Sequence, residues 1–199
     1  MIHLKAASTH MSSMSNKPTA DEIADMADRG QDVSRYFTNK GTARYPNIIA
    51  ELRPTVYAEA TMKVDQYIVA LKARRRGFHL ITDEVLSQLP GLAAFKGGLA
   101  HLHLLHTSAS LSLNENTDPD VAIDLETIFT NLVGDGGYRH SLEGADDMSA
   151  HAKSSMLGTS LLLPIRDGSL LLGTWQGIYL CEHRERGGTR RMAVTLLGE

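Results

Sequence analysis

The sequence predicts an α+β fold: a strand-dominated domain with two to three short helices, preceded by an N-terminal extension. Three observations predict this class. After residue 62, segments that alternate apolar and polar residues, as half-buried strands do, outnumber helical segments. Glycine-containing turns separate several of these segments. One segment near the middle of the chain carries a full set of helix start and stop signals.

The chain changes character near Met62. Residues 1–61 begin with a stretch rich in Ser, Met and His that follows no period, and residues 19–37 could form a helix with only a narrow apolar stripe. We expect residues 1–61 to be a poorly ordered or partly helical extension. Residues 62–199 are then the folded domain.

The first half of this domain predicts strands around a short helix. Residues 63–73 alternate and are rich in β-branched and aromatic side chains, and residues 78–81 follow as a shorter strand. Thr82 is placed to cap a helix that has two acidic residues in its first turn. Residues 99–113 form a long strand region, and its alternation slips at Leu104 and Leu105, which indicates a bulge.

The helix over 118–134 is the best specified element. Asp118 is the predicted N-cap, Pro119 takes the first helical position and Gly134 ends the helix. The apolar positions expected to face inward are Val121, Leu125, Ile128, Phe129 and Leu132.

A third helix and four strands complete the domain. Asp146 or Asp147 caps the helix over 148–157, which Gly158 closes. Strands are expected over 160–165, 169–175, 178–184 and 189–197. Asp167 and Gly168 form a strong hairpin turn, and a glycine pair at 187–188 is expected to turn the last two strands into a hairpin.

Composition excludes several classes of protein. The chain has 199 residues, 42% of them hydrophobic, and a formal net charge of −3, so bulk charge favours neither nucleic acid nor a membrane surface. No apolar run is long enough for a transmembrane helix, and no signal-peptide layout opens the chain. The single cysteine, Cys181, cannot form an internal disulfide, which fits a cytoplasmic protein.

Three histidines stand in polar motifs at the ends of separate elements: His106, His140 and His151. Three protein ligands are the minimum for an open metal site, so this set is a candidate for binding a divalent metal, Mg²⁺ or Zn²⁺. The alternative is that these are three ordinary hydrogen-bonded histidines. The sequence leaves both interpretations open.

The acids most suited to a partly buried site are Glu115, Asp124 and Glu182. Glu182 follows apolar residues on one strand face, and a buried acid needs a partner. Arg190 or Arg191 could supply one, so a structural ion pair is the alternative to a catalytic role for Glu182.

Further candidates are an aromatic residue, an amide and two cations. Trp175 could stack on a flat ligand that Gln176 hydrogen-bonds, or it could be a core residue. Arg139 and Lys153 could meet an anionic substrate. The sequence contains no phosphate-binding loop, dinucleotide fingerprint or GxSxG motif.

Several long motifs, in one order, resemble the YjbQ family, also called the secondary thiamine-phosphate synthase enzyme family. The resemblance covers about residues 63–199. It rests on His106-Thr-Ser-Ala-Ser, the run from Asn114 to Val121, Tyr138-Arg139-His140, Ala150-His151-x-Lys153, and the run from Leu172 through Glu182-His183-Arg184.

The resemblance implies a compact, largely antiparallel α+β fold, a β-sheet or sandwich domain that assembles as a homotrimer. It also implies weak thiamine-phosphate synthase activity, a transferase reaction that joins a pyrimidine diphosphate to a thiazole phosphate. It implies Glu115, Asp124, His140, His151 and Glu182 as catalytic residues. Glu115 and Asp124 could hold Mg²⁺, Arg139 and Lys153 could meet phosphate, and Trp175 with Gln176 could position a ring. The cations are few for two phosphorylated substrates, which suits a side activity of a small metabolite enzyme.

Two alternatives to this activity stand beside it. One is a metal-dependent hydrolase that uses His106, His140 and His151. The other is a trimeric protein that binds a ligand in the same polar pocket without catalysis.

Overall fold

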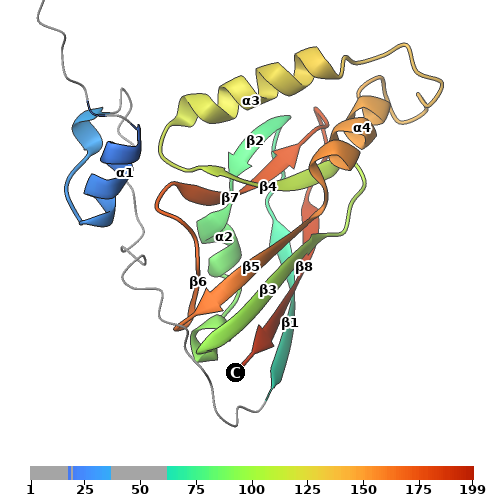
Figure 1. Ribbon diagram of the computed structural model, residues 1–199. Helices are drawn as coiled ribbons and strands as arrows, with labels where there is room; N and C mark the ends of the chain where they lie inside the picture. The colour runs from blue at the N-terminus through green and yellow to red at the C-terminus, as the bar shows by residue number, and fades with distance from the viewer. Residues whose placement is uncertain (1–17, 19, 37–61) are drawn as a thin grey trace, which may run out of the picture.

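The computed structural model describes residue 18, residues 20–36 and residues 62–199. In residues 62–199 a five-stranded and a three-stranded antiparallel sheet pack face to face. The two longer helices lie on the outer face of the three-stranded sheet (Figure 1). The strands are β1 (Lys63–Leu71), β2 (Gly77–Leu80), β3 (Gly97–Leu104), β4 (Ala109–Glu115), β5 (Ser160–Arg166), β6 (Ser169–Leu170), β7 (Gln176–Glu182) and β8 (Arg190–Gly198). The helices are α1 (Ala20–Asp28), α2 (Thr82–Leu86), α3 (Pro119–Leu132) and α4 (Asp147–Leu157), with 3₁₀ turns η1 (Ser34–Tyr36) and η2 (Leu92–Ala94). The predicted α+β class is confirmed.

The larger sheet has the strand order β1-β8-β3-β5-β6, and the smaller has the order β2-β7-β4. Every ladder is antiparallel. The main core lies between the sheets and includes Leu102, Val194 and Leu196 from the larger sheet and Leu111 and Leu180 from the smaller one. A second apolar cluster lies on the other side of the smaller sheet, where Phe78 and Tyr179 pack against Phe129 of α3.

The burial of each strand follows from this layering. On β8 buried and more accessible residues alternate, because only one face of the larger sheet meets the core. On β7 every residue after Gln176 is buried, because the main core covers one face and α3 the other. Because both faces of the sheet are covered at β7, this strand has a nearly continuous run of apolar residues in the sequence.

Two expected connections differ from the structure. The region 99–113 is two strands rather than one bulged strand: β3 belongs to the larger sheet and β4 to the smaller, and the chain crosses between them over residues 105–108. The expected hairpin of the last two strands is also wrong, since β7 and β8 lie in different sheets. The turn at Asp167 and Gly168 is confirmed, with φ of 47° and 77°.

The helix ends agree with the sequence in part. The side chain of Asp118 accepts a hydrogen bond from the Asp120 N–H at 2.9 Å, so the predicted N-cap of α3 is confirmed. Ile128 and Leu132 were expected inside but are more than half exposed, because only one edge of α3 meets the smaller sheet. Thr82 is the first residue of α2 rather than its cap, and its hydroxyl instead accepts the Ile178 N–H.

The extension is described in part. The helix expected over 19–37 is shorter, with α1 at Ala20–Asp28 followed by η1. The rest of the expectation for residues 1–61 falls outside the described residues. No helix among the described residues is long and apolar enough to cross a bilayer.

Candidate functional site

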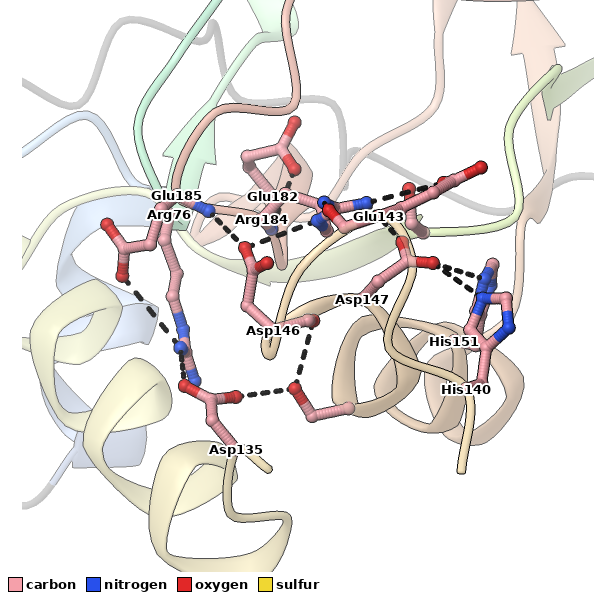
Figure 2. Close-up of polar contacts among 12 residues, drawn as sticks. Arg76, Asp135, His140, Glu143, Asp146, Asp147, His151, Glu182, Arg184 and Glu185 are labelled. Carbon is pink, nitrogen blue, oxygen red and sulfur yellow. Dashed lines mark hydrogen bonds and ion pairs between the residues drawn. The ribbon is translucent and has the colours of Figure 1, made fainter. Parts of the chain in front are cut away.

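The structure brings two histidines and one carboxylate together at the start of α4. Asp147 is the first residue of this helix, and His151 lies one turn further on, so their side chains share a face. His140 comes from the connection between α3 and α4. Figure 2 shows both histidines directed at Asp147.

The ligand atoms of this cluster are close enough for one metal ion. Nε2 of His140 lies 2.8 Å and Nε2 of His151 lies 3.3 Å from the same oxygen, Oδ2 of Asp147. All three ligand atoms are within 4.8 Å of one another. The imidazoles are 46% and 30% exposed respectively, whereas the carboxylate is 1% exposed. The cluster is therefore anchored on its buried acid and open on the side of its histidines.

Asp147 is held as an anion in spite of its burial. Burial by itself raises the pKa of this carboxyl, but the hydrogen bond with His140 and the charges of Arg184 and His151 outweigh burial, so the pKa lies below its ordinary value. Oδ1 accepts a hydrogen bond from the Arg184 guanidinium, which leaves Oδ2 for the two imidazoles.

The tautomer of His151 follows from its other contact. Nδ1 of His151 lies 3.0 Å from the carbonyl oxygen of Thr107. A carbonyl oxygen can only accept, so Nδ1 carries the hydrogen, and in the neutral ring the lone pair is on Nε2. That lone pair faces Oδ2 of Asp147 at 3.3 Å. Because both atoms are acceptors, a proton or a cation must lie between them.

Arg184 ties this cluster to the loop after β7. Its guanidinium also pairs with Asp146, with 3.2 Å between Nε and Oδ2, and its backbone N–H donates to Oε1 of Glu182 at 2.9 Å. The N–H of Glu185 donates to Oδ2 of Asp146 at 2.9 Å. The loop and the start of α4 are thus held together by several charged contacts (Figure 2).

Glu182 has a fully buried side chain that is paired with Arg190. Two oxygen–nitrogen contacts of 2.7 Å join the carboxylate and the guanidinium, in the forked geometry that this pair favours. Of the two interpretations of Glu182, the structural ion pair is the one its contacts support. Arg190 is its partner rather than Arg191.

Lys153 lies inside the protein, on a different face of α4 from the histidine. Its side chain is 0% exposed, and Nζ is 3.9 Å from Oε1 of Glu126. Burial and the nearby Arg76 lower the pKa of Lys153, against the opposing charges of Glu126 and Asp135. Arg76 joins those two acids, and its pairing with Asp135 is drawn in Figure 2. In this position Lys153 does not reach a phosphate on the surface.

Three expected site residues lie at the opposite end of the smaller sheet. Glu115 pairs with Gln176 at one end of the β4–β7 ladder, and Ala109 pairs with Glu182 at the other. The two ends are six residue steps apart along the strand, about 20 Å. Trp175 precedes Gln176, whose side chain accepts the Gly173 N–H within its own turn. Burial and the nearby Asp118 raise the pKa of Glu115.

The other expected residues also lie apart from the cluster. Nε2 of His106 accepts the backbone N–H of Arg191 at 2.8 Å and its Nδ1 faces the Arg190 guanidinium at 3.5 Å, so both ring nitrogens have contacts away from the cluster. Asp124 is exposed on α3, and Arg139 is exposed beside His140. Of the expected metal set, His140 and His151 converge, and Asp147 takes the place expected for His106.

Asp147 was missed as a site residue, and Arg184 was missed as the residue that orients it. Asp147 was seen only as a helix cap, yet its spacing of four residues from His151 on one helix was a visible signal for a shared face. Arg184 carried no such signal, because its partners come from a distant helix.

Two imidazoles and one carboxylate suit a divalent transition metal such as Zn²⁺, Mn²⁺ or Fe²⁺, and leave coordination positions open. An ion held in this way can polarise a bound oxygen group or acidify a bound water. The expected metal site is supported to this extent: the cluster could bind a metal ion.

The fold and the cluster define a small two-sheet α+β domain with an open histidine–aspartate site at one end. The chain belongs to the YjbQ-like family of UPF0047 proteins: residues 67–199 match the family described as UPF0047 protein YjbQ-like.

Relatives and solved structures agree with this membership. The chain is 58% identical over 135 residues to the UPF0047 protein YjbQ of Salmonella typhimurium, a match that covers 67% of this chain and 98% of the relative. It is 40% identical over 146 residues to a UPF0047 protein of Synechocystis, covering 72% and 99%. A YbjQ-like protein of unknown function from Sulfolobus solfataricus has a TM-score of 0.62 at 26% identity, covering 70% of this chain and 100% of that one.

The expectation of thiamine-phosphate synthase activity is corrected by these comparisons. The relatives are named only as UPF0047 proteins, and the Sulfolobus protein is described as being of unknown function, so neither the synthase nor either of its two alternatives gains support. The geometry gives a physical reason for the correction. Lys153 is buried, and Trp175 and Gln176 lie at the far end of the smaller sheet, so the expected substrate-binding residues do not form one pocket.

Proposed function

We propose that this protein binds a divalent transition-metal ion through Nε2 of His140, Oδ2 of Asp147 and Nε2 of His151, with coordination positions left for an external ligand. The observation that carries the proposal is the contact between His151 Nδ1 and the Thr107 carbonyl at 3.0 Å. It directs the Nε2 lone pair at the anionic Asp147. Metal-binding histidines commonly donate their other ring N–H to a carbonyl in this way.

The identity of the metal follows from the donor set. Two imidazole nitrogens favour Zn²⁺, Fe²⁺ or Mn²⁺ over Mg²⁺, which prefers an all-oxygen shell. The competing interpretation is an ion-pair cluster in which one or both histidines are protonated against Asp147. A metal titration separates the two, because a proton and a metal ion compete for the same lone pairs.

The test is isothermal titration calorimetry of the full chain with ZnCl₂, with bound zinc counted by elemental analysis. We expect one ion per chain in the wild type and at least a hundredfold weaker binding in His140→Ala, whose imidazole is 46% exposed and so leaves the core intact. His79→Gln is the matched control, since Nε2 of His79 contacts the Arg75 carbonyl away from the cluster. Equal zinc binding by wild type and His140→Ala would refute the site.

We also propose a homotrimer that uses the uncovered face of the larger sheet. Across that face the register places Val64 beside Leu197 and Leu197 beside Leu99, and all three side chains are 38% to 57% exposed. A contiguous apolar row of this kind is typical of an interface. Light scattering of the wild type and of Val64→Asp tests the proposal, because a charge in this row should release monomers.

We propose a cytoplasmic location, which the single cysteine of the chain supports.

A further inference from the structure

A pocket lies at the C-terminal end of α4, the helix whose N-terminal end carries the proposed metal centre. Its volume is about 500 Å³, within the range of small-molecule sites. Its walls come from the connection between β3 and β4, which contributes His106 and Thr107, and from the last turn of α4, which contributes Ser154 and Ser155. The pocket lies open to solvent on one side.

Two hydrogen-bond partners of His151 form part of the pocket wall. Thr107 accepts from Nδ1 of His151, and the Ser155 hydroxyl donates to the His151 carbonyl at 2.9 Å. Asp147, His151 and Ser155 follow one another at intervals of four residues, so they form one stripe along α4, with about 6 Å between successive positions. The pocket is therefore about one helical turn from the ion that His151 would hold.

The wall combines hydroxyl and imidazole groups with the apolar side chains of Leu104 and Leu105. None of the residues that line the pocket is a lysine, an arginine, an aspartate or a glutamate. The hydrogen-bonding groups are the hydroxyls of Thr107, Ser155 and Thr159 and the imidazoles of His103 and His106, whereas the buried Ser154 hydroxyl already donates to the Ala109 carbonyl. Burial and the adjacent Arg190 lower the pKa of His106, so this ring is neutral near pH 7. A ligand body that carries hydroxyl groups matches such a wall, and a charged body does not.

We infer that the pocket and the metal centre together bind a small polyhydroxylated carboxylate, with the carboxylate on the metal and the hydroxyl-bearing chain against Thr107 and Ser155. The inference rests on the proposed metal site. An α-hydroxycarboxylate offers two oxygens at a spacing that suits two open coordination positions on one ion. The rest of its chain then extends along the stripe of α4 into the pocket.

The test is calorimetric titration of the zinc-loaded full chain with D-gluconate. Sorbitol, which lacks the carboxylate, and hexanoate, which lacks the hydroxyls, serve as matched probes, and metal-free protein is titrated in parallel. We expect binding of gluconate only to the zinc-loaded chain, and at least tenfold weaker binding of both matched probes. Thr107→Val should weaken gluconate binding about five- to tenfold while zinc affinity stays unchanged, because the variant keeps the carbonyl that orients His151.

Thr127→Val is the control variant, since Thr127 is exposed on α3 and donates to the Ile123 carbonyl. If zinc binds but gluconate does not, or if Thr107→Val or hexanoate matches the wild-type gluconate result, the ligand inference fails and the metal centre stands. If gluconate binds equally with and without zinc, the inference also fails. Absence of zinc binding overturns the metal centre and the inference together.

Discussion

The guanidinium of Arg184 holds Oδ1 of Asp147 and thereby leaves Oδ2 of that carboxylate to the two histidines. The arginine is itself fixed, because its backbone N–H donates to Glu182 and its Nε pairs with Asp146. A ligand oriented by a second residue loses geometry when that residue is removed, even though the ligand remains.

The first prediction concerns this orienting contact. Arg184→Gln should weaken zinc binding about 10- to 100-fold, because Asp147 loses the donor that fixes its carboxylate. Arg186→Gln, in the same loop but exposed, should leave zinc affinity unchanged. Calorimetric titration with ZnCl₂ measures both, and equal affinity in the two variants would show that Arg184 does not act on the site.

The second prediction concerns the buried pair of Glu182 and Arg190. Glu182→Ala should lower the free energy of unfolding by about 3–5 kcal/mol, because it leaves the buried guanidinium without its counter-charge. The double variant Glu182→Met with Arg190→Met should cost clearly less, since neither charge remains. Urea denaturation measures both. A double variant less stable than Glu182→Ala would contradict this account.

The sequence predicted the parts of the fold that depend on local chemistry. Asp118 and Pro119 define the start of α3 through contacts within one turn, and Asp167 with Gly168 defines a turn through backbone conformation alone. The partition of strands between sheets depends on distant pairing. β4 follows β3 closely in sequence but pairs with β7, and no local signal distinguishes that crossover from a bulge.

The same limit applies to the site. His140 and His151 were predicted from their polar surroundings, and the structure places their rings 5.4 Å apart. A capping role and a ligand role both use a carboxylate at the start of a helix, so the sequence assigned Asp147 to a cap although its spacing from His151 also allowed a shared site. Glu115 was expected in the site as a partly buried acid and from the family resemblance, but strand β4 carries it away from the cluster.

The third prediction tests the cap of α3. Asp118→Ala should lower the free energy of unfolding by about 1 kcal/mol, because the Asp120 N–H loses its acceptor. Asp124→Ala, an exposed change within the same helix, should alter stability by less than about 0.5 kcal/mol. Asp124→Ala also tests whether Asp124 binds the metal. We expect the zinc affinity of this variant to equal that of the wild type. Chemical denaturation and a zinc titration supply the two measurements.

The fourth prediction concerns acid stability and His183, a fully buried imidazole whose Nε2 lies 2.8 Å from the Ser110 hydroxyl. Burial, with the charges of Lys153, Arg76 and Arg190, lowers the pKa of His183 to about 3. In the unfolded chain the ordinary value is about 6.5. The unfolded state therefore takes up a proton below pH 6.5, whereas the folded state does not until about pH 3.

Because the folded pKa is the lower one, the stability contributed by neutral His183 is complete above pH 6.5 and is lost as the pH falls toward 3. Between pH 6.5 and 5 this residue alone should remove about 2 kcal/mol from the free energy of unfolding. His183→Gln, which keeps a nitrogen near Ser110 but does not titrate, should lose that much less than the wild type over the same interval. The free energies of unfolding of the two proteins, measured by urea denaturation, should therefore differ in their slope against pH. Any cost of packing Gln in place of His is the same at every pH and does not change that slope. Equal slopes for the two proteins would mean that His183 takes up its proton at the same pH in the folded and unfolded states. The argument that burial lowers its pKa would then be wrong.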